Sequence, residues 1–490
     1  MEVYNEILNK HLEINKRRYN EFLEQIIKRT SNINNYITIN ELEQLYSNLY
    51  EHNQANDTDL LSELVSNLDE NLVIKYYREL YKNKGIILKT NRRSPISITT
   101  ERHKLKINRY LLSPVSKNDA IKLMQVDGIK SVYPIDEVLG ISKLPFKMTI
   151  SAMLKVSEVA QDSKSFKDAA LRLVNDSGMK LNSKTIMDVT SHVGGIAFEH
   201  ELNIAKKYFN DIIINHNWKL FPENKKDGIL YILVDGVMVN TRQKDKIIDS
   251  GWKENKLGLV YRAKDVRIRG NKEKQEENSE IRHEILEKEY TAYIGKKEIF
   301  EVLLFGCAVK NGYGKFKETV LLSDGATWIR NMKDKLFPDA QQILDLFHLK
   351  EKIWNFSKLY FKENIKNYTP WAFEMCDKIE KSQYKFVIDK VKIMEDKINL
   401  LNNKLSKYIE NNIDCIDYMT YKSKGYNIGS EAIESANKSV LQYRLKQPGM
   451  IWNIKNAQNM VTLRAKMESN KWFSEVVVPL RQKYGIKCIF

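Results

Sequence analysis

The chain has 490 residues, which is enough for two to four domains with sizeable cores. Its 79 lysines and arginines outnumber its 63 acids, and the net charge of +16 favours a polyanionic partner, with a membrane surface as the rival. No apolar stretch approaches the roughly 18 residues of a spanning helix, and the N-terminus lacks the form of a signal peptide, so we expect a cytoplasmic protein. Four scattered cysteines give no zinc signature, and any metal should therefore be held by oxygen.

Residues 1–81 contain no proline or glycine and show helical apolar spacing, for example at Leu42, Leu45 and Leu49. This pattern predicts a helical N-terminal domain, more consistent with a small bundle than with a coiled coil. Residues 82–147 follow as a basic linker and a small mixed module, in which 82–95 are rich in turn residues. Such a linker is solvated more often than it tracks phosphates.

Residues 148–218 contain a pattern typical of a helix-turn-helix. A helix is predicted from Ser165 to Val174, and Asn182 or Ser183 caps a second helix that runs from Lys184 to His192. Any pair of antiparallel helices has this outline, so a DNA-reading role and a purely structural role both remain open. If the segment reads DNA, Asn182, Ser183 and Lys184 begin the recognition helix.

Two buried strands are predicted to end in an aspartate. The apolar run from Ile229 to Val234 stops at Asp235, and the run from Thr319 to Leu322 leads into Asp324. Each aspartate precedes a glycine, so an ordinary turn is the alternative. Carboxylates at the ends of neighbouring strands lie along one edge of a sheet, and a divalent cation would offset the cost of burying them.

Further elements are predicted around these strands. The runs 258–261 and 299–308 read as strands, and the polar segment 267–278 reads as an exposed loop. A long helical stretch spans 351–409. Downstream, Gly429-Ser430 precedes a helix that carries Glu431 and Glu434 one turn apart, near the helix end that favours anions. Either glutamate would complete a set of three acids.

These motifs resemble the transposases of bacterial insertion sequences, and in particular the Mutator-like branch of the DDE enzymes. The resemblance spans about 148 to 472 and rests on Asp235-Gly236, on 323–329, on 337–340 with 345–348, and on Ile428 to Ser430 with Glu434 before 444–452. It implies an α/β ribonuclease-H-like core, a mixed sheet flanked by helices, with mainly helical N-terminal domains. The core would comprise 219–350 and 425–490, separated by an α-helical insertion at 351–424.

The resemblance also implies site residues. Asp235, Asp324 and Glu434 would be the catalytic carboxylates and would hold two Mg²⁺ ions, with Mn²⁺ as a possible substitute. Glu431 is the reserve, because the family has a small residue at that position. Asp345 and His348 would lie beside the catalytic acids, although an Asp-His pair that only orders a helix is an equal alternative.

The implied partner is double-stranded DNA, as the terminal inverted repeats of the element and as target DNA, bound by a homo-oligomer on paired ends. In the C-terminal part, four basic residues would contact phosphates: Lys438, Arg444, Lys446 and Arg464. The cysteine-ligated module of related transposases is absent here. Two rival functions remain: a metal-dependent nuclease that cuts without joining, and a non-catalytic DNA-binding protein derived from a transposase.

Overall fold

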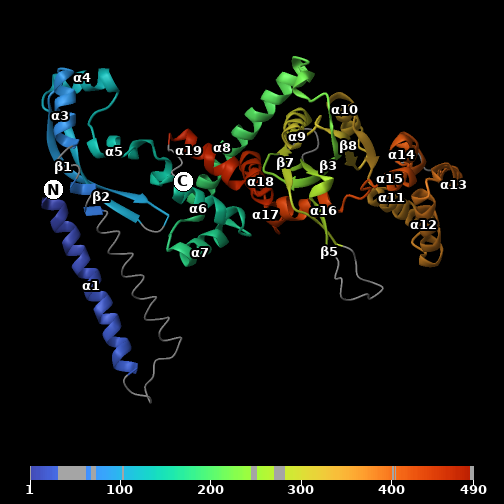
Figure 1. Ribbon diagram of the computed structural model, residues 1–490, viewed down its shortest axis with the longest axis horizontal. Helices are drawn as coiled ribbons and strands as arrows, with labels where there is room; N and C mark the ends of the chain where they lie inside the picture. The colour runs from blue at the N-terminus through green and yellow to red at the C-terminus, as the bar shows by residue number, and fades with distance from the viewer. Residues whose placement is uncertain are drawn as a thin grey trace. The chain divides into compact units, whose positions relative to one another are not determined.

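The computed structural model describes residues 2–30, 62–63, 65–67, 73–101, 104–243, 251–269, 282–399, 402 and 404–485. The chain divides into two compact units, which are treated separately below. Unit 1 comprises Met1–Val159 and Lys167–Val189, and unit 2 comprises Ala160–Phe166 and Thr190–Phe490. Within the described ranges, no helix has the length and apolar character needed to cross a bilayer. Figure 1 labels the elements.

Unit 1 is built on a β-hairpin packed against helices. β1 (Leu88–Thr99) pairs antiparallel with β2 (Lys104–Pro114), and their inward side chains join two small apolar clusters. The accompanying helices are α1 (Glu2–Thr30), α3 (Ile74–Asn83), α4 (Lys117–Asp127), α5 (Pro134–Val138), and the short helices η3 (Ile141–Lys143) and η4 (Pro145–Lys147). The predicted turn-rich linker at 82–95 was wrong, because its second half forms β1. The predicted helices at Leu42 to Leu49 lie outside the described residues.

Three helices follow the hairpin: α6 (Ile150–Gln161), α7 (Phe166–Ser177) and α8 (Ser183–Phe209). The predicted pair of helices is present, but α8 continues well beyond His192. Gly194 lies inside α8 and does not end it. A Cβ at this position would lie 2.4 Å from the backbone oxygen of Asn459, so glycine allows the helix to pack closely there. That contact offsets the roughly 1 kcal/mol by which glycine weakens a helix.

Unit 2 contains a five-stranded mixed sheet flanked by helices, which confirms that part of the fold prediction. The order is β7-β4-β3-β8-β9, formed by β3 (Lys226–Asn240), β4 (Trp252–Arg262), β7 (Lys288–Ile294), β8 (Phe316–Ser323) and β9 (Gln341–Leu344). β4 is antiparallel to both β3 and β7, whereas β8 is parallel to β3 and to β9. A separate hairpin joins β5 (Val266–Arg269) to β6 (Arg282–Ile285).

Both faces of this sheet are buried. Leu230, Ile232 and Val234 of β3 pack in a cluster with α9 (Lys297–Asn311) and α10 (Thr327–Leu336). Tyr231 and Leu233, which point the other way, join a larger cluster with α11 (Leu346–Tyr360), α16 (Glu431–Ala436) and α18 (Ile454–Glu468). The alternation along β3 therefore separates the two layers.

Three predictions in this unit were wrong in detail. The run 299–308 was predicted as a strand but is part of helix α9. Periodicity does not distinguish a helix that is apolar on all sides from a buried strand. β3 does not end at Asp235 but continues to Asn240, where it still pairs with Trp252 of β4. Of the predicted loop 267–278, the first three residues belong to β5 and the rest lies outside the described residues.

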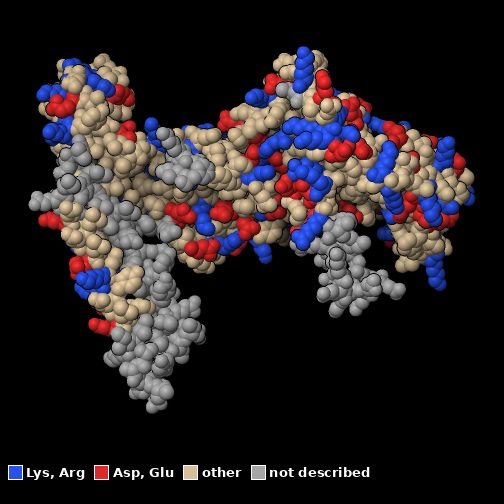
Figure 2. All heavy atoms as spheres, viewed as in Figure 1, with Lys and Arg blue, Asp and Glu red and all other residues tan. Residues whose placement is uncertain are grey.

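The region between β9 and α16 is helical, as predicted, and continues from α11 into α12 (Ile365–Glu380), α13 (Tyr384–Lys397), α14 (Leu405–Asn411), η8 (Ile413–Cys415) and α15 (Tyr418–Ser423). The other short elements of unit 2 are η5 (Asn210–Ile214), η6 (Trp218–Leu220), η7 (Ala263–Asp265), η9 (Asn437–Gln442), α17 (Tyr443–Leu445), η10 (Phe473–Val477) and α19 (Val478–Lys483). Acidic and basic side chains are interspersed on the face of this unit drawn in Figure 2.

Side chains from helices cover both edge strands of the sheet. On β7, Gln458 of α18 accepts the backbone N–H of Ile294 at 2.8 Å, and the Ser469 hydroxyl accepts that of Tyr290 at 2.9 Å. On β9, the Tyr418 hydroxyl donates to the carbonyl oxygen of Leu344 at 2.9 Å. These bonds satisfy backbone groups that an open edge would leave free to pair with another chain.

Candidate functional site

Three aspartates lie at one level of the sheet, on three adjacent parallel chain segments. The last residue pairs between β3 and β8 and between β8 and β9 are Val234–Ser323 and Ser323–Leu344. The next residue on each segment is an aspartate: Asp235, Asp324 and Asp345. Neighbouring strands are about 4.8 Å apart, so this register brings three carboxylates side by side.

Asp235 is half-buried and is held by two donors. The backbone N–H of Gly236 donates to its Oδ1 at 2.7 Å, and the Asn437 amide donates to its Oδ2. Burial raises the pKa of Asp235 above its ordinary value, and the negative charge of Asp324 raises it further. Asp324 itself accepts the backbone N–H of Ala326 at 3.0 Å.

Asp345 is fully buried and caps helix α11. Its carboxylate accepts the backbone N–H groups of Phe347 and His348, each at 3.2 Å, and also binds the His348 ring. Burial alone would raise the pKa of Asp345, but hydrogen bonds from His348 and Ser430 hold it below its ordinary value. The bond to Asp345 raises the pKa of His348 to about 9, and the charges of Asp235 and Asp324 contribute.

Glu434 reaches the same place from α16. The Ser430 hydroxyl oxygen lies 2.7 Å from Asp345 Oδ2 and 2.9 Å from Glu434 Oε1, so it bridges the two carboxylates. One ligand atom each of Asp345, His348 and Glu434 lies within 4.8 Å of the others, a spacing that could hold a metal ion. Carboxylate oxygens are the donors that Mg²⁺ and Mn²⁺ prefer.

A polar cleft of about 450 Å³ opens over part of this group, and neither Asp324 nor Asp345 lines it. Asp235, His348 and Glu434 line it together with Asn437, and the remaining lining residues are Val237, Phe347, Glu351, Lys438 and Gln442. The exposed Glu431 is not among the lining residues, although it is one turn from Glu434.

Asn437 is a site residue that the sequence analysis missed. Helix α16 passes into the π-helical turn η9 at this residue, and such wide turns are frequent at functional sites. The side chain is buried and binds Asp235 through its amide nitrogen, while its oxygen has no hydrogen-bond partner in the described part of the chain. Asparagine three positions after the third acid is the only signal in the sequence.

Two of the residues predicted to contact DNA are instead inside the protein. Arg444 is fully buried, donates to the carbonyl oxygen of Ala160 at 3.0 Å and packs on the rings of Phe166 and Trp452. Arg464 is buried as well and binds Gln161 and Glu468, among others. Both guanidinium groups hold the segment 160–166, so they present no surface to a phosphate. The local sequence around a basic residue on a helix does not show that its partners come from a distant segment.

The other predicted DNA contacts are at the surface. Lys438 and Lys446 are exposed, and Lys438 lines the cleft. In unit 1, Asn182 caps helix α8 as predicted, because its side chain accepts the backbone N–H of Thr185 at 2.8 Å. Ser183 is the first residue of α8, and the exposed Lys184 forms a surface ion pair with Asp188 at 3.1 Å.

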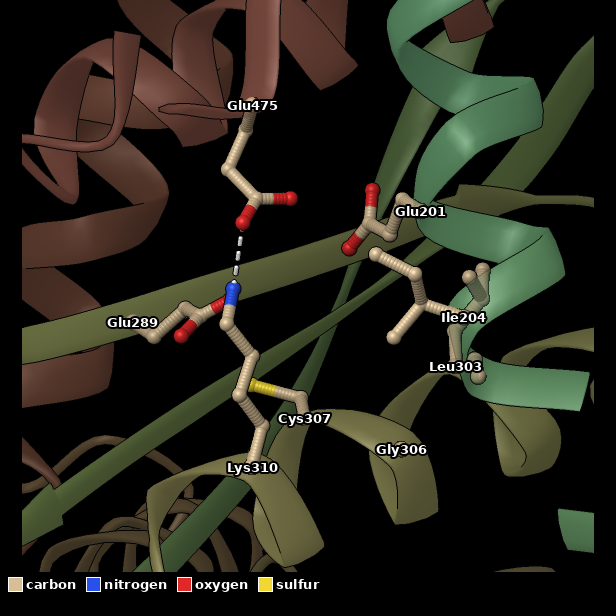
Figure 3. A pocket seen from close by; sticks show the side chains of 9 residues that line it. Glu201, Ile204, Glu289, Leu303, Gly306, Cys307, Lys310 and Glu475 are labelled. Atoms are coloured by element: carbon tan, nitrogen blue, oxygen red, sulfur yellow. Dashed lines mark hydrogen bonds and ion pairs between the residues drawn. The ribbon is translucent and has the colours of Figure 1, made fainter. Parts of the chain in front are cut away.

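A second group of acids, buried or partly buried, lies elsewhere in unit 2, and Figure 3 shows three of them around Lys310. Lys310 binds Glu289 at 2.9 Å and Glu475 at 2.6 Å, and the fully buried Lys466 binds Glu201 at 2.9 Å. Burial alone would raise the pKa of Glu289, but the two lysines hold it below its ordinary value. This lysine–glutamate cluster joins α8, β7, α9, α18 and η10, and its cavity of about 20 Å³ has room for little more than one water molecule.

Comparison with known proteins gives no match for this chain, either among protein-family models or among curated proteins.

Proposed function

We propose that this protein is a DDE transposase of an insertion sequence. In this proposal it binds the terminal repeats of its element and catalyses metal-dependent cleavage and strand transfer of DNA. One observation carries the proposal: Asp235 and Asp324 follow the last paired residues at one level of adjacent parallel strands, and Asp235 and Glu434 line one cleft.

The order of the sheet supports a ribonuclease-H-like core. Three antiparallel strands, β3, β4 and β7, come first; helix α9 then crosses over to β8 and β9, which are parallel to β3. This is the arrangement expected from the resemblance, with a helical insertion ahead of the last acid. Fold alone does not give activity, so the proposal depends on the carboxylates.

In the proposed reaction the carboxylates hold and orient the reacting groups. Two Mg²⁺ ions, with Mn²⁺ as a possible substitute, would supply the charge that activates the attacking water or 3′-hydroxyl and neutralises the leaving oxygen. Asp235 would contact both ions, and Asp324 and Glu434 would contact one each. Asn437 would fix the Asp235 carboxylate through their hydrogen bond.

Asp345 and His348 support the site in this proposal. Asp345 fixes the His348 ring and, through Ser430, the Glu434 carboxylate. A protonated His348 offsets part of the carboxylate charge while no cation is bound, which lowers the cost of assembling several acids in one place. The exposed Lys438 at the cleft would contact a DNA phosphate.

The proposed partners are the two ends of the element and target DNA. Joining requires both ends to be held together, so we propose that a homo-oligomer performs the reaction. The rival is a nuclease that uses the same carboxylates but does not join.

Strand transfer of a labelled duplex tests the proposal. The duplex carries the DNA that flanks the gene on each side, and the assay compares wild type with Glu434→Gln and Glu431→Gln in Mg²⁺. Of these two glutamates, Glu434 lines the cleft and Glu431 does not. We therefore expect Glu434→Gln to lower joining at least about 10³-fold and the matched control Glu431→Gln to retain it.

Other outcomes decide against the proposal. Cleavage without joined product identifies a nuclease. Binding of the duplex without either reaction identifies a non-catalytic DNA-binding protein. Equal loss with both variants removes Glu434 from its assigned role.

A further inference from the structure

The hairpin of unit 1 carries basic residues and no acid along both strands. β1 and β2 have 12 and 11 residues, and neither contains aspartate or glutamate. Their basic residues are Lys89, Arg92, Arg93, Lys104, Lys106 and Arg109. A run of one charge sign on a paired ribbon differs from the alternating charges of an ordinary solvated surface.

The pairing register sorts these side chains by face. Ile96 pairs with Ile107 on the buried face, against the helices of unit 1. Ser97 pairs with Lys106 and Pro95 with Asn108, and all four of these side chains are exposed. The small residues on β1 leave Lys106 and Asn108 projecting from a flat surface.

Most of this charge has no ion-pair partner among the residues that the structure describes. Arg109 is the exception: it is buried and pairs with Asp136 at 2.7 Å. The four exposed residues Lys89, Arg92, Lys104 and Lys106 form no ion pair with any described residue. Arg93 lies over the ring of Tyr110, with its guanidinium carbon 4.5 Å from the ring centre.

We infer that the β1–β2 ribbon is a second DNA-binding surface, separate from the cleft of unit 2 and from the start of α8. A strand of 12 residues spans roughly 40 Å, about one turn of duplex DNA, and a two-stranded ribbon fits the roughly 12 Å width of the major groove. Lysine and arginine would contact phosphates, and Asn91 and Asn108 are of the type that contacts base edges.

This inference rests on the proposed function for the choice of DNA as the polyanion, and it assigns to unit 1 a part in holding the element's ends. It needs no catalysis. The test therefore measures binding without divalent metal, so that failure of strand transfer and failure of the ribbon are separate results.

The experiment compares two full-length variants that each lose four positive charges. The ribbon variant carries Lys89→Thr, Arg92→Thr, Lys104→Thr and Lys106→Thr, because threonine suits an exposed strand. The matched control carries Lys366→Gln, Lys385→Gln, Lys397→Gln and Lys407→Gln, which are exposed on the helices between β9 and α16. Circular dichroism and thermal melting confirm that both variants fold.

Fluorescence anisotropy with a labelled duplex of the element's flanking DNA gives Kd between 50 and 200 mM salt. We expect the ribbon variant to raise Kd at least about tenfold at 100 mM and to reduce the slope of log Kd against log salt by about 3 to 4. The control variant should change neither value by a comparable amount.

An unchanged Kd and slope in the ribbon variant overturns the inference. Equal weakening in both variants also overturns it, since the effect is then one of net charge. A ribbon variant that keeps DNA binding but loses binding to vesicles with phosphatidylserine would assign the ribbon to a membrane surface instead.

Discussion

Two groups of carboxylates lie in unit 2, one beside Lys310 and Lys466 and one at the level where β8 and β9 end beside β3. In the lysine–glutamate cluster each acid has an ammonium group nearby, and the pKa of Glu289 is lowered. In the candidate site, no lysine or arginine in the described part of the chain forms an ion pair with the acids, and the pKa of Asp235 is raised. Both groups are at least partly withdrawn from water.

The difference lies in where the compensating cation comes from. Acids that pair with lysines within the fold have their charge balanced there, and these ion pairs hold helices on the sheet. In the candidate site the His348 imidazolium pairs with Asp345, whereas Asp235, Asp324 and Glu434 form no ion pair with a lysine or arginine of the described residues, and their negative charge favours a cation from outside. The two groups therefore differ in whether their charge is balanced by lysines within the fold.

The largest expected effect is on the structural side. Lys466→Met leaves Glu201 buried without its ammonium partner, and we expect the free energy of unfolding to fall by about 3 to 5 kcal/mol. Denaturant unfolding measures this change. Lys455→Met, an exposed site on the same helix, is the control and should cost less than about 0.5 kcal/mol. A small effect at Lys466 would show that the cluster does not hold the fold.

Next, a divalent cation should stabilise the candidate site. At Mn²⁺ or Mg²⁺ concentrations about 100 times Kd, we expect the folded state to gain about 2.7 kcal/mol, measured as a rise in melting temperature. Asp324→Asn and Glu434→Gln should lose most of this gain, whereas Glu289→Gln should keep it, because the lysines already satisfy its cluster. The same gain in all of the proteins would place the cation elsewhere.

Neutralising one acid in each group should then change the free energy of unfolding in opposite directions. Glu289→Gln weakens two lysine pairings and should cost about 2 kcal/mol. In chelator, Asp235→Asn removes a repelled charge but keeps an acceptor for Asn437, so we expect a gain of about 1 kcal/mol. Thermal or denaturant unfolding measures both. If both variants are destabilised, the two groups of acids do not differ in how their charge is balanced.

A smaller effect is expected at Asn437. Replacement by alanine leaves Asp235 without its amide donor, and strand transfer should fall about tenfold, equivalent to about 1.4 kcal/mol. Ser435→Ala, an exposed change in the same segment, should leave the rate unaltered. If both variants are as active as wild type, Asn437 does not position Asp235.

The smallest effect is a dependence on pH. Because the folded pKa of Glu289 is lowered from 4.5, its stabilising contribution is complete above about pH 4.5 and is lost as the pH falls through the folded pKa. The stability gap between wild type and Glu289→Gln should therefore be constant near neutral pH and narrow in acid. A gap that widens in acid would reverse the assigned sign.

The sequence predicted the centre of the sheet because long apolar runs report burial directly. The apolar run from Ile229 and the aspartates at 235 and 324 needed no tertiary information. The helix α9 was misread because its apolar residues surround it on all sides. The strand β7 was missed because its sequence, KEYTAYI, mixes polar and apolar residues and shows no long apolar run. Periodicity identifies elements that are half exposed, not those that are wholly buried.

Other parts of the site depend on contacts between distant segments. The alignment of Asp345 with Asp235 follows from the register of β9, which has only four residues. The burial of Arg444 depends on Phe166, which is far away in the sequence. Neither relationship leaves a local pattern, so both required the structure.

The covering of β7 by α18 has a consequence for synthesis on the ribosome. Ile294 and the side chain that caps it, Gln458, are 164 residues apart. At 5 to 20 residues per second, the nascent chain therefore exposes an uncapped strand edge for about 10 to 30 seconds. A prematurely terminated product would keep that edge open, so we expect such fragments to aggregate and be degraded rather than accumulate.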